Sequence, residues 1–399
     1  MKQPVLRLGV LIFAVALVSS VLTSPGYCQA NDFSDFQLPD LPQPELPGDV
    51  QPEPQKNLEK INSNDAAKTA KPTGGKKTGG RTARPNPFDS PNFVKTPEEL
   101  KSEFAAIRKM KIAYSGSIPA VPRSIVSVMN NTQSQQRSKA ELQNLMAYRA
   151  VVGVPYHDMT LDKTQTSHAT AGAMLLAFLG KLDHTPQKPN NYPQDLYDWG
   201  YKGTSSGNLY MSATNSGITG SVMSFMNDSD PGNIKMLGHR RWCINPYMKT
   251  TGFGESGRWG VMWSFDQSRP HGEFSYDKIG FPACGLTPAN MLQPDWAWNV
   301  SLNPEKYTYL GDEKLKITVT PAFFNAKTAA LKKSNRPALN LDSVSVNQDG
   351  YAIPLCVIFR PNGVMLQPGA AYCVEIDGFA DSTGTAQKIL YWVVFCKPM

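Results

Sequence analysis

The sequence has little net charge and no long hydrophobic run. Its 399 residues contain 40 Lys and Arg against 33 Asp and Glu, which gives a formal charge of +7. So small an excess on so long a chain argues against a nucleic-acid-binding protein, in which positive charge is concentrated. No apolar run reaches the roughly 20 residues that a membrane-spanning helix needs. The sequence therefore predicts no nucleic-acid partner and no transmembrane segment in the mature chain.

Residues 1–30 have the pattern of a secretory signal peptide. Two basic residues precede an apolar run over 8–18, and small and polar residues lead to Ala30. A charged start, a short apolar centre and a small residue at the exit are typical of such peptides, whereas a membrane anchor would need a longer apolar run. Lipidation at Cys28 is a third interpretation, which the residues before it do not favour. We therefore expect a secreted protein, extracellular or periplasmic.

Five cysteines remain beyond this leader, and an oxidising compartment permits disulfides between them. Cys373 and Cys396 lie in strand-like runs that could pair as neighbours, which favours a bridge between them. A second bridge between Cys243 and Cys284 is compatible with the sequence. Five unbonded thiols are the alternative.

Residues 31–96 are predicted to be a disordered linker. They are rich in proline, glycine and lysine and contain few large aliphatic side chains. Such a segment cannot bury enough apolar surface to offset the entropy of ordering it. Its basic part, 68–84, has six positive charges and no acid, and could contact an anionic envelope polymer or lipid surface. A solvated charge run is the simpler interpretation.

Folded structure is expected from residue 97, where Thr96 is placed to cap a helix. Apolar spacing predicts helices over 100–112, 138–152, 164–180 and 220–227. Short strands separated by turn residues follow, at 257–265, 298–302, 314–320, 343–346, 354–359, 372–376 and 389–395. We expect an α/β domain over 97–297, to which the stretch 253–298 is assigned, and an all-β sandwich of immunoglobulin or fibronectin type over 298–399.

Six short features of the helical part occur in the order typical of one family. They are Leu142-x-Asn144 with Tyr148-Arg149 and Gly153, Leu161, Leu182-Asp183-His184, Asn208-Leu209, Gly238-His239-Arg240-Arg241-Trp242 with Asn245-Pro246, and Gly252-Phe253-Gly254. Over residues 139–265 the chain resembles the CAP superfamily, the secreted SCP-like domain of cysteine-rich secretory proteins, venom allergens and plant pathogenesis-related proteins. The resemblance implies a three-layer α-β-α domain with a central cleft.

In many CAP proteins two histidines and two glutamates line that cleft and can hold a divalent metal. On this sequence the resemblance assigns the histidines to His184 and His239. Gly207 occupies the position of the first glutamate, and Asp228 could replace the second. Two imidazoles and at most one carboxylate are thus retained, whereas catalytic zinc usually has three protein ligands.

Two interpretations of the histidines follow. In one, His184, His239 and Asp228 bind a divalent cation such as zinc weakly, with Asn208 and Arg240 beside them in the cleft. In the other, the histidines hydrogen-bond neighbouring backbone and order the cleft. We expect one arginine of the Arg240-Arg241 pair to make an internal ion pair or contacts with carbonyl oxygens, with Trp242 in the core.

Two functions fit these features. The missing glutamate favours a secreted CAP-domain module that binds a lipid, glycan or protein at the cell envelope, and it disfavours an enzyme. The alternative is a metal-assisted hydrolase, a protease or envelope-polymer hydrolase, that uses the two histidines. A serine hydrolase is disfavoured because no Gly-x-Ser-x-Gly motif surrounds Ser205 and Ser206.

Overall fold

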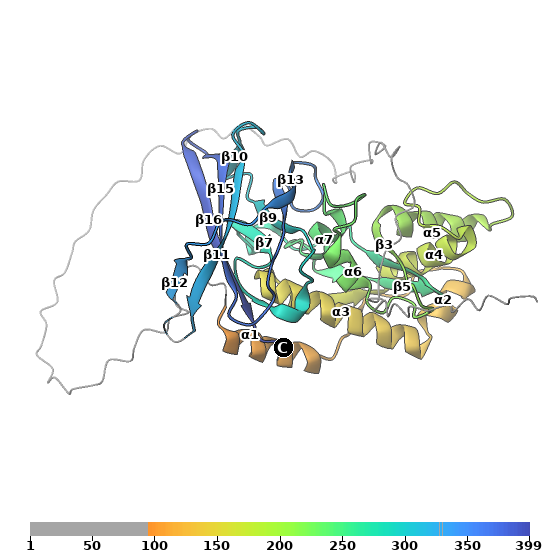
Figure 1. Ribbon diagram of the computed structural model, residues 1–399. Helices are drawn as coiled ribbons and strands as arrows, with labels where there is room; N and C mark the ends of the chain where they lie inside the picture. The colour runs from red at the N-terminus through yellow and green to blue at the C-terminus, as the bar shows by residue number, and fades with distance from the viewer. Residues whose placement is uncertain (1–94, 327, 329) are drawn as a thin grey trace, which may run out of the picture.

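The computed structural model describes residues 95–326, 328 and 330–399, which form a mixed α/β structure with helices in the first half and mostly strands in the second (Figure 1). The signal peptide, Cys28, the linker up to residue 94 and its basic part lie outside the described residues. No helix within the described ranges is long and apolar enough to cross a membrane.

Four of the helices correspond to predicted ones. The helices are α1 (Pro97–Lys109), α2 (Arg123–Met129), α3 (Thr132–Val152), α4 (Lys163–Leu179), α5 (Gln194–Ser205), α6 (Ser221–Asn227) and α7 (Gly238–Cys243). The predictions for α1, α3, α4 and α6 are confirmed, although α3 begins at Thr132 instead of Ser138. At α1, Thr96 Oγ1 accepts a hydrogen bond from Glu99 N at 3.1 Å, and the Glu99 carboxylate accepts one from Thr96 N at 2.7 Å. This capping box fixes the N-terminal end of α1.

An antiparallel three-stranded sheet lies between α3 and α4. Its strands run in the order β3 (Gly207–Met211), β6 (Trp259–Trp263) and β5 (Phe253–Ser256). Successive side chains of a strand point to opposite faces. In β5, Glu255 bonds Arg137 of α3, whereas a Cβ added to Gly254 would lie 2.0 Å from Thr170 N of α4. The two helices therefore cover opposite faces of this sheet.

A smaller parallel sheet, β1 (Tyr114–Ser115), β2 (Thr160–Asp162) and β4 (Thr250–Thr251), joins the loops beside α4. Helix α5 packs along α4 on the same side. A Cβ added to Gly203 of α5 would lie 2.0 Å from the His168 carbonyl oxygen of α4. Glycines lower the helix propensity of α5, which is why the sequence did not predict this helix. The same glycines allow α5 and α4 to approach one another closely.

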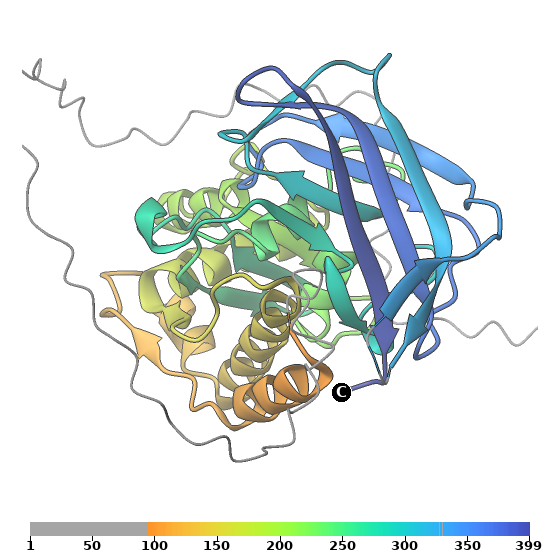
Figure 2. The same cartoon turned by 90° about the vertical axis from the view of Figure 1, so that its left-hand side faces the viewer.

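The C-terminal part is built from two sheets. One has the order β13 (Leu341–Asn347), β14 (Cys356–Pro361), β9 (Trp298–Leu302) and β7 (Lys278–Phe281). The other has the order β12 (Ala330–Lys333), β11 (Lys316–Asn325), β15 (Ala371–Asp381), β16 (Ala386–Cys396) and β8 (Gly285–Pro288), with β10 (Tyr307–Tyr309) paired to β15. The Trp298 ring in β9 contacts Tyr372 and Phe395 of the second sheet, at centroid distances of 5.6 and 6.3 Å. The two sheets therefore pack face to face (Figure 2).

The strand pairing places the start of this second unit earlier than expected. Strand β7 pairs with β9, and β8 pairs in parallel with β16, although both precede residue 298. The stretch 253–298 is therefore shared, with β5 and β6 in the first unit and β7 and β8 in the second. The partner of β8 lies about 100 residues further along the chain, so local patterning carried no sign of this pairing. One continuous hydrophobic core includes side chains from both units, and the C-terminus lies beside α1 in both views (Figures 1 and 2).

The expected disulfides are not formed, since all five cysteines of the described residues are unbonded. Strands β15 and β16 do pair, but Cys373 lies opposite Trp392, while Cys396 lies beside Pro288 of β8. The register thus separates the two thiols along the sheet. Cys243 is fully buried, and burial raises its thiol pKa, which favours an inert, protonated side chain.

The buried Glu255 carboxylate predicts a pH-dependent contribution to stability. Burial alone would raise its pKa, but hydrogen bonds from Arg137, Ser134 and Ile218 N outweigh this effect and lower it. A carboxylate with a lowered folded-state pKa stabilises the fold above its unfolded pKa of about 4.3, and this contribution is lost as the pH falls through the folded value. Glu255→Gln should therefore cost about 1–3 kcal/mol at pH 7 and much less near pH 3 by urea denaturation. An equal cost at both values would contradict this assignment.

Candidate functional site

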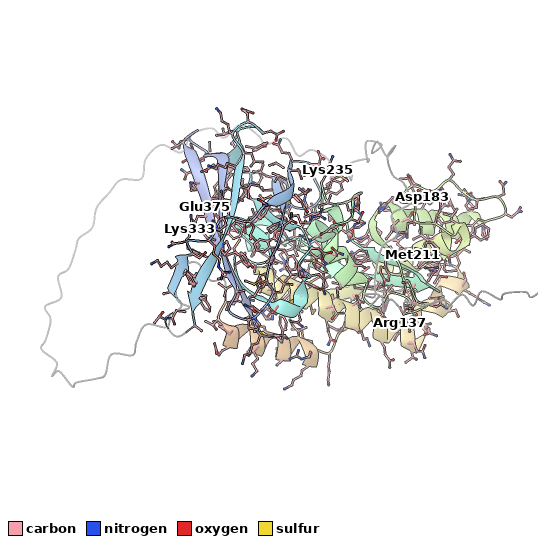
Figure 3. The ribbon with its side chains drawn as sticks, in the orientation of Figure 1. Arg137, Asp183, Met211, Lys235, Lys333 and Glu375 are labelled. Atoms are coloured by element: carbon pink, nitrogen blue, oxygen red, sulfur yellow. The ribbon has the colours of Figure 1, made fainter. Side chains whose placement is uncertain are left out.

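The structure brings His184 and His239 together. His184 lies in the loop after α4, one residue beyond Asp183 (Figure 3), and His239 is the second residue of α7. Their ring centroids lie 6.3 Å apart, and the ring planes differ by 24°. Both side chains are partly exposed, the His239 side chain to 20%. Residues that are 55 positions apart in the sequence thus form one solvent-accessible pair, as the sequence predicted.

Each imidazole is held through its Nδ1 atom. His184 Nδ1 lies 2.9 Å from the Thr204 carbonyl oxygen at the end of α5, and only an N–H can donate to that oxygen. His239 Nδ1 lies 2.7 Å from Asp228 Oδ1. Neither Nε2 has a hydrogen-bond partner among the described residues. Metal-binding histidines usually donate one ring N–H to a carbonyl or carboxylate in this way and coordinate through the other nitrogen.

The pKa values of the two rings are shifted in opposite directions. Burial, together with the nearby His239, lowers the pKa of His184 to about 4, so this ring is neutral at pH 7. Burial would also lower the pKa of His239, but the Asp228 carboxylate outweighs it and raises the pKa above the ordinary value. His239 therefore takes up a proton first as the pH falls. Any cation that binds both rings competes with that proton.

Asp228 acts on His239 instead of lying between the two histidines. Its side chain is 1% exposed. Oδ1 contacts His239 Nδ1, and Oδ2 accepts a hydrogen bond from Arg240 N at 3.2 Å. With both oxygens engaged by α7, Asp228 orients an imidazole, and it occupies the position of a carboxylate that supports a metal ligand from behind. The expectation of direct metal coordination by Asp228 is not supported by these contacts.

Gly207, where the CAP resemblance would place a glutamate, has no room for a side chain. It is buried at the start of β3. A Cβ there would lie 2.6 Å from Val261 Cγ1 and 2.7 Å from the Gly203 carbonyl oxygen. It would also lie 2.9 Å from the Met262 carbonyl oxygen. A glutamate is therefore excluded sterically by the contact between β3, β6 and the end of α5.

The two residues expected beside the histidines are both buried. Asn208 Nδ2 donates to the His239 carbonyl oxygen at 3.0 Å and so ties β3 to α7. Arg240 is fully buried and donates only to oxygen atoms of the protein, so it does not line a cleft, contrary to expectation. Arg241 is likewise buried among carbonyl oxygens, which confirms the expected internal contacts. Trp242 is only half-buried, so the expectation that it lies in the core is wrong, and its ring stacks on Phe265 at a centroid distance of 4.5 Å.

Two neighbours of the pair were not predicted from the sequence. The Phe225 ring in α6 stacks on His239 at a centroid distance of 5.7 Å. Thr204 contributes only its carbonyl oxygen to His184, and a backbone contact leaves no mark in the residue pattern. Val222, Phe225 and Met226 are buried in α6, and their spacing in the sequence does not show which of them meets a histidine.

The described part of the protein has few side chains near His184 and His239 that could coordinate a cation. No three His, Cys, Asp or Glu side chains gather to hold a metal ion within 95–326, 328 and 330–399. Two imidazoles would therefore supply two positions, and the remaining positions of a tetrahedral zinc ion would be open to water or a ligand.

A scan against protein-family models finds no family that matches the chain, and a search of curated proteins finds no match either.

Proposed function

We propose that the chain is a secreted CAP-like module joined to an immunoglobulin-type sandwich, and that it binds an extracellular ligand at the His184–His239 pair. The sheet between α3 and α4 supports the three-layer architecture, together with the order of the CAP-like features in the sequence. The two facing sheets support the sandwich, because β7 and β8 follow one another in the chain but join opposite sheets. The signal-peptide-like pattern of residues 1–30 supports a place outside the cytoplasm.

The main observation in support of a binding site is that the Nδ1 atoms of both histidines contact oxygen atoms of the protein. Thr204 O and Asp228 Oδ1 fix the Nδ1 ends of the two rings, which leaves Nε2 of His184 and His239 for a ligand. Zinc–nitrogen bonds of about 2.0–2.1 Å at a tetrahedral angle place two imidazole centroids roughly 5 Å apart, so the two rings, 6.3 Å apart in this structure, would approach one another by about 1 Å on binding one ion. Imidazole nitrogens are donors that zinc accepts, and a bound zinc ion would offer its remaining positions to an oxygen or nitrogen atom of the ligand.

Binding fits these residues better than hydrolysis does. A metal-assisted hydrolase also needs a group that moves a proton near the bound substrate. Gly207 cannot supply one, and both Asp228 oxygens are engaged by α7. The pair thus has donors for a cation and its ligand, but neither of the two positions that the CAP resemblance assigns to a carboxylate supplies a general base. The ligand classes are those of the cell envelope: a lipid, a glycan or a protein.

A zinc titration with single-site variants tests the proposal. His239→Ala removes one of two donors, so the affinity for zinc should fall at least about 100-fold in isothermal titration calorimetry. Asp228→Asn keeps the donors and removes the carboxylate behind His239, so the affinity should fall about 10-fold to 100-fold. His271→Ala serves as the control, because His271 lies in a separate short helix, stacked on Tyr247. Equal affinities for all four proteins would rule out binding at this pair.

A further inference from the structure

The helix that carries His239 is attached to the sandwich by the next residue in the sequence. The Arg240 guanidinium donates to four oxygen atoms and is fully buried. Two of them, the carbonyl oxygens of Met226 and Asn227 at 2.7 and 2.6 Å, belong to the end of α6. The other two, Ala297 O and Asn299 Oδ1 at 2.7 and 2.9 Å, belong to the segment that leads into β9 and to β9 itself.

The Arg240 guanidinium bonds the chain next to Asp228. Asn227 is the residue immediately before Asp228, whose carboxylate holds the His239 ring. Ser229, immediately after Asp228, accepts a hydrogen bond from Ala297 N at 2.9 Å through its Oγ. The backbone on both sides of Asp228 is therefore bonded, directly or through Arg240, to the strand segment of the sandwich.

Arg241 anchors the other side of the same helix. It donates to Ile353 O at 2.9 Å and also to Asp349 O and Asn347 Oδ1, all at the end of β13 or in the loop that follows it. None of these contacts involves Asp228 or its neighbours. Arg241 thus ties α7 to the sandwich, whereas Arg240 also ties down the segment that orients the imidazole.

We propose that Asn299 of β9 is a positioning residue for the ligand site, because it fixes Arg240 and thereby the Asp228 carboxylate against His239. This inference rests on the proposed function of the histidine pair. The sandwich then contributes a residue that positions the ligand site, in addition to being a second module on the chain. Among the described residues, the Asn299 side-chain oxygen is the one acceptor of the Arg240 guanidinium that comes from a side chain, so it can be changed by substitution without altering the backbone acceptors.

Asn299 allows this role to be separated from simple packing. Its Oδ1 accepts from Arg240, while its Nδ2 is buried without a partner within the described part of the chain. Asn299→Leu removes the acceptor at similar volume, and Asn299→Asp keeps an oxygen in its place. Ser301, two residues along β9 and so on the same face, is fully buried with an unpartnered Oγ. Ser301→Ala is therefore a matched control that leaves Arg240 untouched.

Two readouts are measured on the purified full-length protein and its variants. The first is the affinity for Zn²⁺ by calorimetry. The second is the ¹H–¹⁵N resonance of the His239 Nδ1–H in the protein without metal, which should be shifted downfield by the contact with Asp228. We expect Asn299→Leu to weaken zinc binding about 10-fold and to lose or displace this resonance. Asn299→Asp and Ser301→Ala should keep the affinity within about 2-fold and keep the resonance.

The outcomes separate this inference from the proposed function. If the unchanged protein binds no zinc, the cation site is wrong, and the His239 resonance alone decides whether Asn299 positions the ring. If zinc binds but Asn299→Leu matches Ser301→Ala in affinity and in the resonance, the positioning role is overturned while the cation site stands. A loss of affinity that Asn299→Asp does not restore, with the resonance intact in both variants, would also overturn it.

Discussion

Gly207→Glu is expected to destabilise the fold by at least about 3 kcal/mol and to create no hydrolase. The substitution restores the carboxylate that the CAP resemblance would place here. The first atom of the new side chain would meet Val261 Cγ1 at 2.6 Å and two carbonyl oxygens within 2.9 Å. Overpacking alone costs about 1–3 kcal/mol, and a buried, unpaired carboxylate adds several more. Thermal unfolding followed by circular dichroism measures the loss.

Gly272→Glu is the matched control, because a Cβ at Gly272 meets nothing within 4 Å. It should change the unfolding free energy by less than about 0.5 kcal/mol. A stable Gly207→Glu protein would show that the strand and the end of α5 can separate, and the argument against a glutamate at this position would then fail.

Arg149→Met is expected to lower the free energy of unfolding by about 3–5 kcal/mol, the range for the loss of one partner from a buried polar network. Arg149 is fully buried in α3 and donates to carbonyl oxygens of Pro155, Cys243, Asn245 and Met248. Burial lowers its pKa to about 9, so it stays charged at pH 7. Methionine fills much of the volume but leaves these oxygens without a donor, and the segment after α7 loses its attachment.

Arg258→Met tests whether the cost belongs to that network. Arg258 is exposed in the turn between β5 and β6 and donates to a single carbonyl oxygen, that of Ser212. Its replacement should cost less than about 0.5 kcal/mol in urea unfolding. Similar losses in both variants would mean that the buried carbonyl oxygens find other donors, and that Arg149 does not hold this segment in place.

Local patterns predicted the elements that local physics determines. The Thr96 cap, helix α4 and the predicted short strands of the second half all depend on residues close in sequence, and each is confirmed. Helix α5 was not predicted because Gly200 and Gly203 lower its helix propensity. Both glycines lie where α5 contacts α4, and a side chain at either position would meet the backbone of α4. The partners of β7 and β8 and the register of Cys373 depend on distant pairing, which no local pattern encodes.

The candidate site shows the same division. The resemblance predicted that His184 and His239 would meet, and they do. The roles of Asp228 and Arg240 were not predictable, because a residue type does not show whether its polar atoms face a ligand or the protein interior. Asp228 supports His239, and Arg240 joins the helix of that histidine to strand β9 of the second unit. Both findings required the contacts across the two units.

The central claim is that the two Nε2 atoms of His184 and His239 bind one divalent cation. The most direct measurement is the zinc content of the purified protein after dialysis against a small excess of zinc, beside the His184→Ala, His239→Ala double variant. The account predicts one zinc ion per chain in the unchanged protein and none in a double variant that is folded by circular dichroism. No bound zinc in the unchanged protein, or equal amounts in both, would contradict it.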